Sequence, residues 1–316
     1  MHWKVKGIIQ KVLSGIPGGI ALNDALQKTI GGLSNFEANI DMKVIQDWLV
    51  FMRHLKNLNI DPQGLDYFEV GTGWYPTLPF CFSLAGARRV LTYDLNRHVR
   101  PNWTFRMLQC LEKHLPAIAA ASNRPIEDVW RDYRKLRLET KLNTLLAAAR
   151  IEYRAPADAG STGLPDGCTD VVYSNSVLEH VLAADIPRLM REARRLLRLN
   201  GIAIHSANCG DHYAYFDRDI TAINYLAYSD GAWAFWQNRL LYQNRLRPED
   251  FARIATQAGF IMRHCYFTPK QHLIDALPSI RIAPEFQHYS PEQVCSTSVD
   301  LLLDRGSNGN YESFDR

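Results

Sequence analysis

The 316-residue sequence lacks several features that would assign it to a specialised class. No stretch approaches 18 uninterrupted apolar residues, so no membrane-spanning helix is predicted. Its six cysteines include no C-x-x-C pair, which argues against a zinc knuckle and suits reduced thiols. The 36 lysines and arginines barely outnumber the 33 aspartates and glutamates, unlike the balance of a dedicated nucleic-acid binder. We therefore expect a cytoplasmic protein without a nucleic-acid partner.

The first 60 residues have the pattern of helices rather than strands. Apolar side chains recur at helical spacing at Ile8, Ile9, Val12 and Leu13. We predict an N-terminal helical segment, 1–60, that packs on its own domain. Because lysines are interleaved with these residues, contact with a membrane surface is the alternative.

From Leu65 onward, short apolar runs alternate with helical stretches, which is typical of parallel strands joined by crossover helices. This pattern predicts an α/β domain over residues 61–304, followed by a polar tail at 305–316. The expected strands are residues 67–70, 90–93, 151–153, 170–173, 202–205, 261–267 and 297–303.

Three connections between these strands have distinctive lengths or compositions. Two are too long for simple crossovers: residues 95–150, with room for two or more helices, and residues 209–245, which are rich in aromatic side chains. We expect both to be helical or aromatic lid insertions. The shorter connection predicts a helix over residues 185–199, which Asp185 begins and Asn200-Gly201 ends.

A turn with two glycines follows the first expected strand. Gly71 and Gly73 allow the backbone to turn sharply and to approach a ligand closely. In an open parallel sheet, this turn lies where nucleotide-like ligands bind. Asp94 follows the next strand, about 20 residues later, where a carboxylate can hold a ribose diol. The sequence therefore predicts a nucleoside-containing cofactor.

The residues after the glycines distinguish two kinds of cofactor. A dinucleotide needs a third glycine and an open helix N-terminus for its pyrophosphate, but here Trp74, Tyr75 and Pro76 follow. S-adenosylmethionine has no phosphate, so the bulky residues do not exclude it. An NAD-dependent oxidoreductase is therefore the less favoured alternative, and a protein that binds its cofactor without turnover is the non-enzymatic one.

The motifs, in their order along the chain, resemble those of the class I S-adenosylmethionine-dependent methyltransferases of type 11, the small-molecule branch. Residues 69–73 are similar to the family's first motif, residues 170–181 to the stretch lining the methionine end, and residues 194–201 to the helix end before the fifth strand. The resemblance implies a doubly wound, seven-stranded Rossmann-like sheet whose last strand is antiparallel. It implies S-adenosylmethionine as cofactor, S-adenosylhomocysteine as product, and these cofactor-binding residues: Glu69, Gly71, Thr72, Gly73, Asp94, Leu95, Asp158, Ala159 and Asn175.

Methyl transfer to a hydroxyl group also needs a residue that removes the proton. The candidates at the ends of the fourth and fifth strands are His180, His205, Asp211 and His212. For His180, packing is the slightly favoured role. His205, Asp211 and His212 can also hold a divalent metal, but their spacing fits no dedicated motif, so no metal site is predicted.

Tyr213 and Tyr215 follow the fifth strand closely and are the expected substrate contacts. We expect O-methylation of a small molecule, either a sugar or glycan unit or a natural product. An N- or C-methyltransferase would share every cofactor motif and differ only in the acceptor pocket, so both alternatives stay open. The sequence specifies neither the acceptor nor the oligomeric state.

Overall fold

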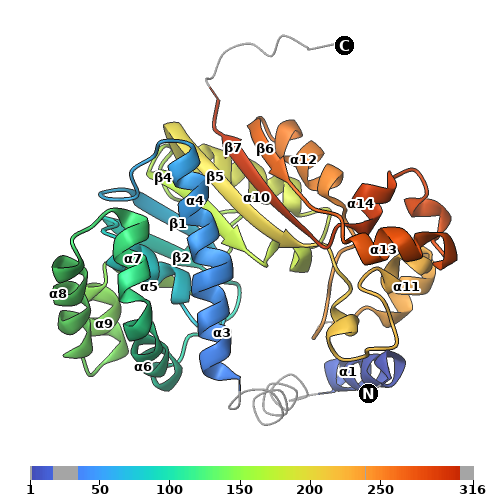
Figure 1. Cartoon of the computed structure of the whole chain (residues 1–316), viewed down its shortest axis with the longest axis horizontal. Coiled ribbons are helices and arrows are strands. Elements are labelled where there is room, and N and C mark those ends of the chain that lie inside the picture. Colours follow the sequence, from blue (N-terminus) through green and yellow to red (C-terminus); the bar gives the residue numbers. More distant parts are fainter. Residues whose placement is uncertain (1, 17–34, 239, 307–316) are drawn as a thin grey trace.

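The computed structural model describes residues 2–16, 35–238 and 240–306. Parts of the expected N-terminal segment (17–34) and polar tail (307–316) lie outside the described residues. Seven strands form one sheet in the order β3-β2-β1-β4-β5-β7-β6 (Figure 1). The strands are β1 Asp66–Val70, β2 Arg89–Tyr93, β3 Ile151–Arg154, β4 Thr169–Asn175, β5 Leu197–Asn208, β6 Ile261–Tyr266 and β7 Ser298–Asp304.

The sheet has the predicted mixed topology. Strands β1 to β5 pair in parallel, whereas β7 is antiparallel to both β5 and β6. All five residues of β1 are buried, as expected for a central parallel strand covered on both faces. The expected doubly wound, seven-stranded Rossmann-like fold is confirmed.

Helices cover both faces of this sheet (Figure 1). The first long connection contains α6 to α9, which confirms the expected helices there. The described α-helices are α1 Trp3–Gly15, α3 Phe36–Met42, α4 Leu49–Asn57, α5 Thr77–Leu84, α6 Pro101–Cys110, α7 Leu115–Ser122, α8 Ile126–Arg137, α9 Leu142–Ala148, α10 Ile186–Leu196, α11 Asp230–Trp236, α12 Pro248–Gln257, α13 Gln271–Ala276 and α14 Pro291–Cys295. The short helical turns are η1 Lys43–Trp48, η2 Leu111–His114, η3 Leu178–His180, η4 His212–Tyr215, η5 Asn224–Ala227, η6 Leu277–Ser279 and η7 Pro284–Phe286.

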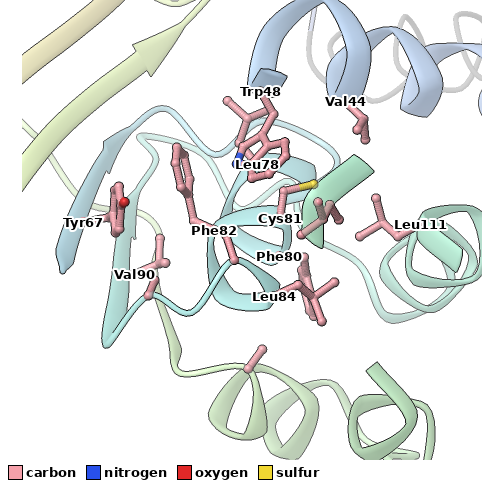
Figure 2. Close-up of a cluster of buried hydrophobic side chains, with 14 of the residues drawn as sticks. Val44, Trp48, Tyr67, Leu78, Phe80, Cys81, Phe82, Leu84, Val90 and Leu111 are labelled. Carbon is pink, nitrogen blue, oxygen red and sulfur yellow. The ribbon is translucent and has the colours of Figure 1, made fainter. Parts of the chain in front are cut away.

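Helix α5, which follows the glycine turn, is buried along its whole length. The Phe82 ring stacks on Tyr67 of β1 at a centroid distance of 4.3 Å. The same Phe82 ring also contacts Trp48 of η1, and Val44 belongs to the same buried cluster (Figure 2). The helical segment 35–57 therefore packs directly over the element that begins at the glycine turn.

Helix α10 differs from the prediction at its C-terminal end. The expected helix over residues 185–199 ends instead at Leu196. Leu197 already pairs with Thr169 of β4 and is fully buried. Asn200-Gly201 therefore lies inside β5, and its predicted role as the helix end is wrong. Strand pairing and burial of Leu197 outweigh the local helix propensity, which is only a weak preference.

The insertion at 209–245 forms a separate apolar cluster with the N-terminal helix. The Trp3 ring packs on Tyr213 and Trp236, with centroid distances of 5.4 and 4.8 Å, and Figure 1 shows α1 against α11. One face of α1 thus packs on the protein's own chain, as predicted, while its other face leaves Val5 and Ile8 about half exposed. Within the described ranges, no helix is both long and apolar enough to cross a membrane.

A buried arginine joins this insertion to the C-terminal part of the chain. The Arg247 side chain is fully buried. Its guanidinium donates hydrogen bonds to the carbonyl oxygens of Cys209 (2.7 Å), Gln293 (3.0 Å) and Val294 (3.2 Å), and to that of Ser296. A planar guanidinium with five donors can satisfy several carbonyl groups at once, so Arg247 fixes the base of the insertion beside the end of β5.

We predict that Arg247→Leu lowers the free energy of unfolding by roughly 3 kcal/mol, because several buried carbonyl groups lose their donors. Denaturant unfolding followed by circular dichroism would measure the change. Arg263→Leu is the matched control, since Arg263 forms an exposed ion pair with Asp304 and its loss should cost less than about 1 kcal/mol. Equal effects of the two variants would contradict this role of Arg247.

Candidate functional site

The glycine turn after β1 needs both of its glycines. Gly71 and Gly73 have φ values of +81° and +66°, in the left-handed region that favours glycine. A Cβ on Gly71 would also lie 2.5 Å from a methyl group of Val177, in the loop after β4. The turn therefore packs directly against the β4 loop, and no larger residue fits at position 71.

Three polar side chains support this turn from below. The Thr92 hydroxyl donates to the Glu69 carboxylate, and the Thr72 and Thr92 hydroxyls are also hydrogen-bonded. All three residues are buried. Burial raises the pKa of Glu69 to about 8. The structure thus places the predicted cofactor residues Glu69 and Thr72 in a buried network beneath the turn, rather than on its open side.

Asp94 joins the turn to the end of β2. Its carboxylate accepts hydrogen bonds from the backbone N–H groups of Gly73 and Asn96, both at 2.9 Å. The next side chain, Leu95, is 67% exposed. An acidic group beside an exposed apolar side chain, next to a glycine turn, suits a ribose and an adjoining base.

The remaining predicted cofactor residues lie along the same edge of the sheet. The backbone N–H of Ala157 donates to the Asp94 carbonyl, which brings Asp158 and Ala159 beside the β2 end. The Asp158 carboxylate forms an ion pair with Arg188 at 2.8 Å. Asn175, at the end of β4, has a hydrogen-bond partner on η1, whose bounds are Lys43–Trp48.

The bulky residues after the glycines point toward neighbouring helices and loops. The Tyr75 ring packs edge-on against Phe36 of α3, at a centroid distance of 4.9 Å. The Trp74 ring lies 4.6 Å from the ring of His98, in the loop after β2. Tyr75 is therefore part of the packing between the turn and the N-terminal helices.

A cavity of about 830 Å³ lies at the carboxyl ends of β4 and β5. It is bounded by η1 and α4 on one side and by the 209–245 insertion on another. Many lining side chains are polar, including Asn175, Ser176, Ser206, Asn208, Asp211 and Tyr215. The volume and the polar lining suit a small acceptor with several hydrogen-bonding groups.

The catalytic candidates differ in their access to this cavity. Asp211 is among the lining residues, and burial raises the pKa of its carboxylate to about 6. His205 is fully buried, is hydrogen-bonded to Ser174 at 2.8 Å, and is not among the lining residues. Burial lowers the pKa of His205 to about 4, so the imidazole is neutral near pH 7.

The two predicted substrate tyrosines also lie in different environments. Tyr213 is buried in the cluster with Trp3 and Trp233. Tyr215 is 67% exposed, lines the cavity, and stacks on His212 at a centroid distance of 5.5 Å. The structure thus brings Tyr215, but not Tyr213, to the cavity.

A cluster that the sequence analysis did not identify lies beside the cavity. In the part of the chain that the structure describes, Glu179, His180 and His212 form a group that could hold a metal ion. One potential ligand atom of each residue lies within 4.8 Å of those of the other two. The trio of His205, Asp211 and His212, for which no metal site was predicted, does not form such a group among the described residues. Burial raises the pKa of Glu179 to about 8 and lowers that of His212 to about 4. In the sequence, the one sign of this cluster was the acidic residue directly before His180, at the start of an apolar turn.

We predict that Glu69 makes the stability of the protein depend on pH. Between about pH 4.5 and pH 8, the folded protein holds a proton on Glu69 that the unfolded chain has lost. The free energy of unfolding should therefore fall as pH rises through this window, by at most about 1.4 kcal/mol per pH unit. In denaturant titrations at several pH values, Glu69→Gln should reduce the slope of the free energy of unfolding against pH by up to the contribution of one proton.

The exposed Glu127→Gln in α8 is the control for Glu69→Gln, and it should leave the slope unchanged. Glu179, which has a similarly raised pKa, contributes to the slope in all three proteins and does not affect their comparison. Identical slopes for the wild type and Glu69→Gln would contradict the raised pKa of Glu69.

Comparison with known proteins gives matches of two kinds. Residues 132–205 match the family described as "Methyltransferase domain". No curated protein matches the chain. Among solved structures, an S-adenosylmethionine-dependent methyltransferase from Mesorhizobium loti is 18% identical, with 79% of this chain and 95% of that chain covered and a TM-score of 0.42.

Two further solved structures have similar scores. A geranyl diphosphate methyltransferase in complex with S-adenosylmethionine is 13% identical, with 87% of this chain and 92% of that chain covered and a TM-score of 0.45. Phosphoethanolamine N-methyltransferase 2 from Haemonchus contortus, solved with phosphomonomethylethanolamine and S-adenosylhomocysteine, is 14% identical. The match covers 82% of this chain and 53% of that chain, with a TM-score of 0.45.

The family match runs from α8 through β3 and β4 into β5. It includes the β4 loop that packs on Gly71. It also lies within a seven-stranded sheet whose last strand is antiparallel, as the resemblance implied. The match supports neither the oxidoreductase nor the non-catalytic alternative. Residues 132–205 thus match a methyltransferase domain, in agreement with the resemblance drawn from the sequence motifs.

Proposed function

We propose that this methyltransferase transfers the methyl group of S-adenosylmethionine to a hydroxyl oxygen of a small, polar molecule, such as a sugar unit or a hydroxylated natural product. The observation that carries the proposal is the cavity of about 830 Å³ at the ends of β4 and β5, with the buried carboxylate of Asp211 in its wall. The cavity supplies hydrogen-bonding groups for an acceptor, and the carboxylate supplies a base.

The cofactor occupies the neighbouring part of the sheet edge in this proposal. Gly71 and Gly73 allow the methionine portion to approach the backbone, and Asp94 accepts hydrogen bonds from the ribose hydroxyls. Leu95 and Ala159 provide apolar contacts for the adenine, and Asp158 accepts from its amino group. Asn175, which this proposal assigns to the methionine end of the cofactor, lines the cavity, so the sulfonium methyl group would face the acceptor.

The reaction requires alignment and the removal of one proton. The acceptor oxygen attacks the methyl carbon in line with the carbon–sulfur bond, whose electrons remain on the sulfur as S-adenosylhomocysteine forms. Asp211 takes the hydroxyl proton as the oxygen is methylated. Its pKa of about 6 leaves it ionised near neutral pH and still close to the operating pH, as a general base requires.

The surroundings of Asp211 hold its carboxylate in place. It accepts hydrogen bonds from the backbone N–H of Tyr213 at 2.8 Å and from the Asn224 side chain at 3.0 Å. Tyr215 extends the cavity wall with an aromatic face that suits the apolar side of a sugar ring. We therefore propose Asp211 as the base ahead of His205, His212 and His180, and Tyr215 ahead of Tyr213 as the acceptor contact.

We predict that Asp211→Asn lowers kcat by about 10²- to 10⁴-fold, with little change in the affinity for S-adenosylmethionine. Asparagine keeps an oxygen for the Tyr213 amide but cannot take a proton. For the wild type, kcat should rise about tenfold per pH unit below pH 6 and level off above it, because only the ionised carboxylate acts as a base. Asp219→Asn, an exposed position in the same insertion, should leave both properties unchanged.

The acceptor is tested with paired alcohols and amines that share one carbon skeleton, using S-adenosylmethionine labelled in its methyl group. Mass spectrometry should find the label on oxygen in the alcohol and little label in the amine. Preferential labelling of the amines would reject O-methylation. Full activity of Asp211→Asn at pH 7 would remove Asp211 from the mechanism.

A further inference from the structure

Glu179 is a buried acid without a well-formed hydrogen bond. Its side chain is 1% exposed, and neither carboxylate oxygen has a hydrogen-bond partner. Burial raises the pKa of this carboxyl group, and the nearby backbone N–H groups of Glu179 and Asn208 oppose the shift without satisfying either oxygen. A buried carboxyl group without partners costs several kcal/mol, so a native protein is expected to supply something that binds it.

Two imidazole rings provide further unused ligand atoms beside this carboxylate. The Nδ1–H of His180 donates to the Tyr242 carbonyl at 2.8 Å, which leaves the lone pair of its Nε2 free. Metal-binding histidines commonly have this arrangement, with the second ring nitrogen held by a carbonyl group. The Nε2 of His212 is buried and has no hydrogen-bond partner. The centroids of the two rings are 5.0 Å apart.

The backbone that carries Glu179 and His180 is also held in place. Asn244 donates from its side chain to the carbonyls of Leu178 (2.7 Å) and Val181 (2.9 Å), and from its backbone to that of Glu179 (2.7 Å). Three hydrogen bonds from one residue thus fix the turn η3. A ligand site on this turn is preorganised, because its two ligands from η3 need no rearrangement of the backbone.

We propose that Glu179, His180 and His212 bind one divalent metal ion of the class that includes Zn²⁺, Mn²⁺ and Fe²⁺. Two imidazoles and one carboxylate form a ligand set used by metal sites that keep open coordination positions. Mg²⁺ fits less well, because it prefers oxygen ligands. The ligand atoms lie within 4.8 Å of one another, and ligand atoms about 2 Å from one tetrahedral ion are about 3.4 Å apart, so side-chain movements of about 1 Å close the site.

The position of the site makes it accessible to an ion from solvent and places it near the acceptor cavity. His180 is exposed, so an ion can reach the cluster from solvent. His212 stacks on Tyr215, which lines the cavity, while Glu179, His180 and His212 are not themselves among its lining residues. An ion bound to His212 would lie next to this wall of the cavity, where an open coordination position could bind the acceptor hydroxyl and favour its ionised form. This role rests on the proposed O-methylation, whereas metal binding itself does not.

Metal binding is tested on the full-length protein after treatment with a chelator. Equilibrium dialysis against Zn²⁺, with elemental analysis of the protein, should give one ion per chain. The Co²⁺ form should show the visible absorption of a site with nitrogen and oxygen ligands. Glu179→Gln and His212→Gln should each weaken Zn²⁺ binding by more than the roughly 10- to 100-fold that loss of an outer-shell partner causes.

The control is His288→Gln, which removes an exposed imidazole outside the cluster and should leave Zn²⁺ binding unchanged. Circular dichroism checks that each variant is folded. If Glu179→Gln or His212→Gln does not fold, the variant of the exposed ligand, His180→Gln, is used in its place. The proposal is overturned if the wild type takes up no stoichiometric Zn²⁺, or if all the cluster variants bind it as the wild type does. Titration of the same samples with S-adenosylmethionine separates the two proposals, because a protein that binds Zn²⁺ but not this cofactor would reject only the proposed methyl transfer.

Discussion

The contact between Gly71 and the β4 loop is the constraint on which the rest of the site depends. Because Val177 occupies the space that a Cβ would need, the glycine turn and the end of β4 form one surface. The buried Glu69 network fixes the turn from below, and Asp94 joins it to the end of β2. The carboxyl ends of three strands are thereby held in one arrangement, which a cofactor that spans them requires.

The elements outside the parallel sheet complete this edge. The helical segment 35–57 packs on α5 and contributes side chains to the cavity, while the 209–245 insertion forms its other wall. Arg247 ties the insertion to the C-terminal segment through buried hydrogen bonds to carbonyl groups. Trp3 packs on the outer side of the same insertion. Four parts of the chain that are distant in sequence therefore hold the acceptor cavity beside the glycine turn.

The features that the sequence predicted are those with a local physical cause. Strand positions follow from runs of apolar residues, and Gly71, Gly73 and Asp94 stand at fixed places relative to two such strands. The end of α10 was not predictable in this way, because pairing between Leu197 and Thr169 decides it. Tyr213 and Tyr215 differ by only two positions, yet only the fold shows that Tyr213 is buried against Trp3 while Tyr215 lines the cavity. Likewise, His212 joins Glu179 and His180 only through the fold of the insertion.

The central claim is that the glycine turn and Asp94 together hold the nucleoside part of S-adenosylmethionine. A crystal structure of the protein with S-adenosylhomocysteine tests it most directly. We expect the ribose hydroxyls within hydrogen-bond distance of the Asp94 carboxylate and the amino-acid portion over Gly71 and Gly73. A nucleoside bound elsewhere on the protein, with the turn and Asp94 in contact only with solvent, would contradict the account.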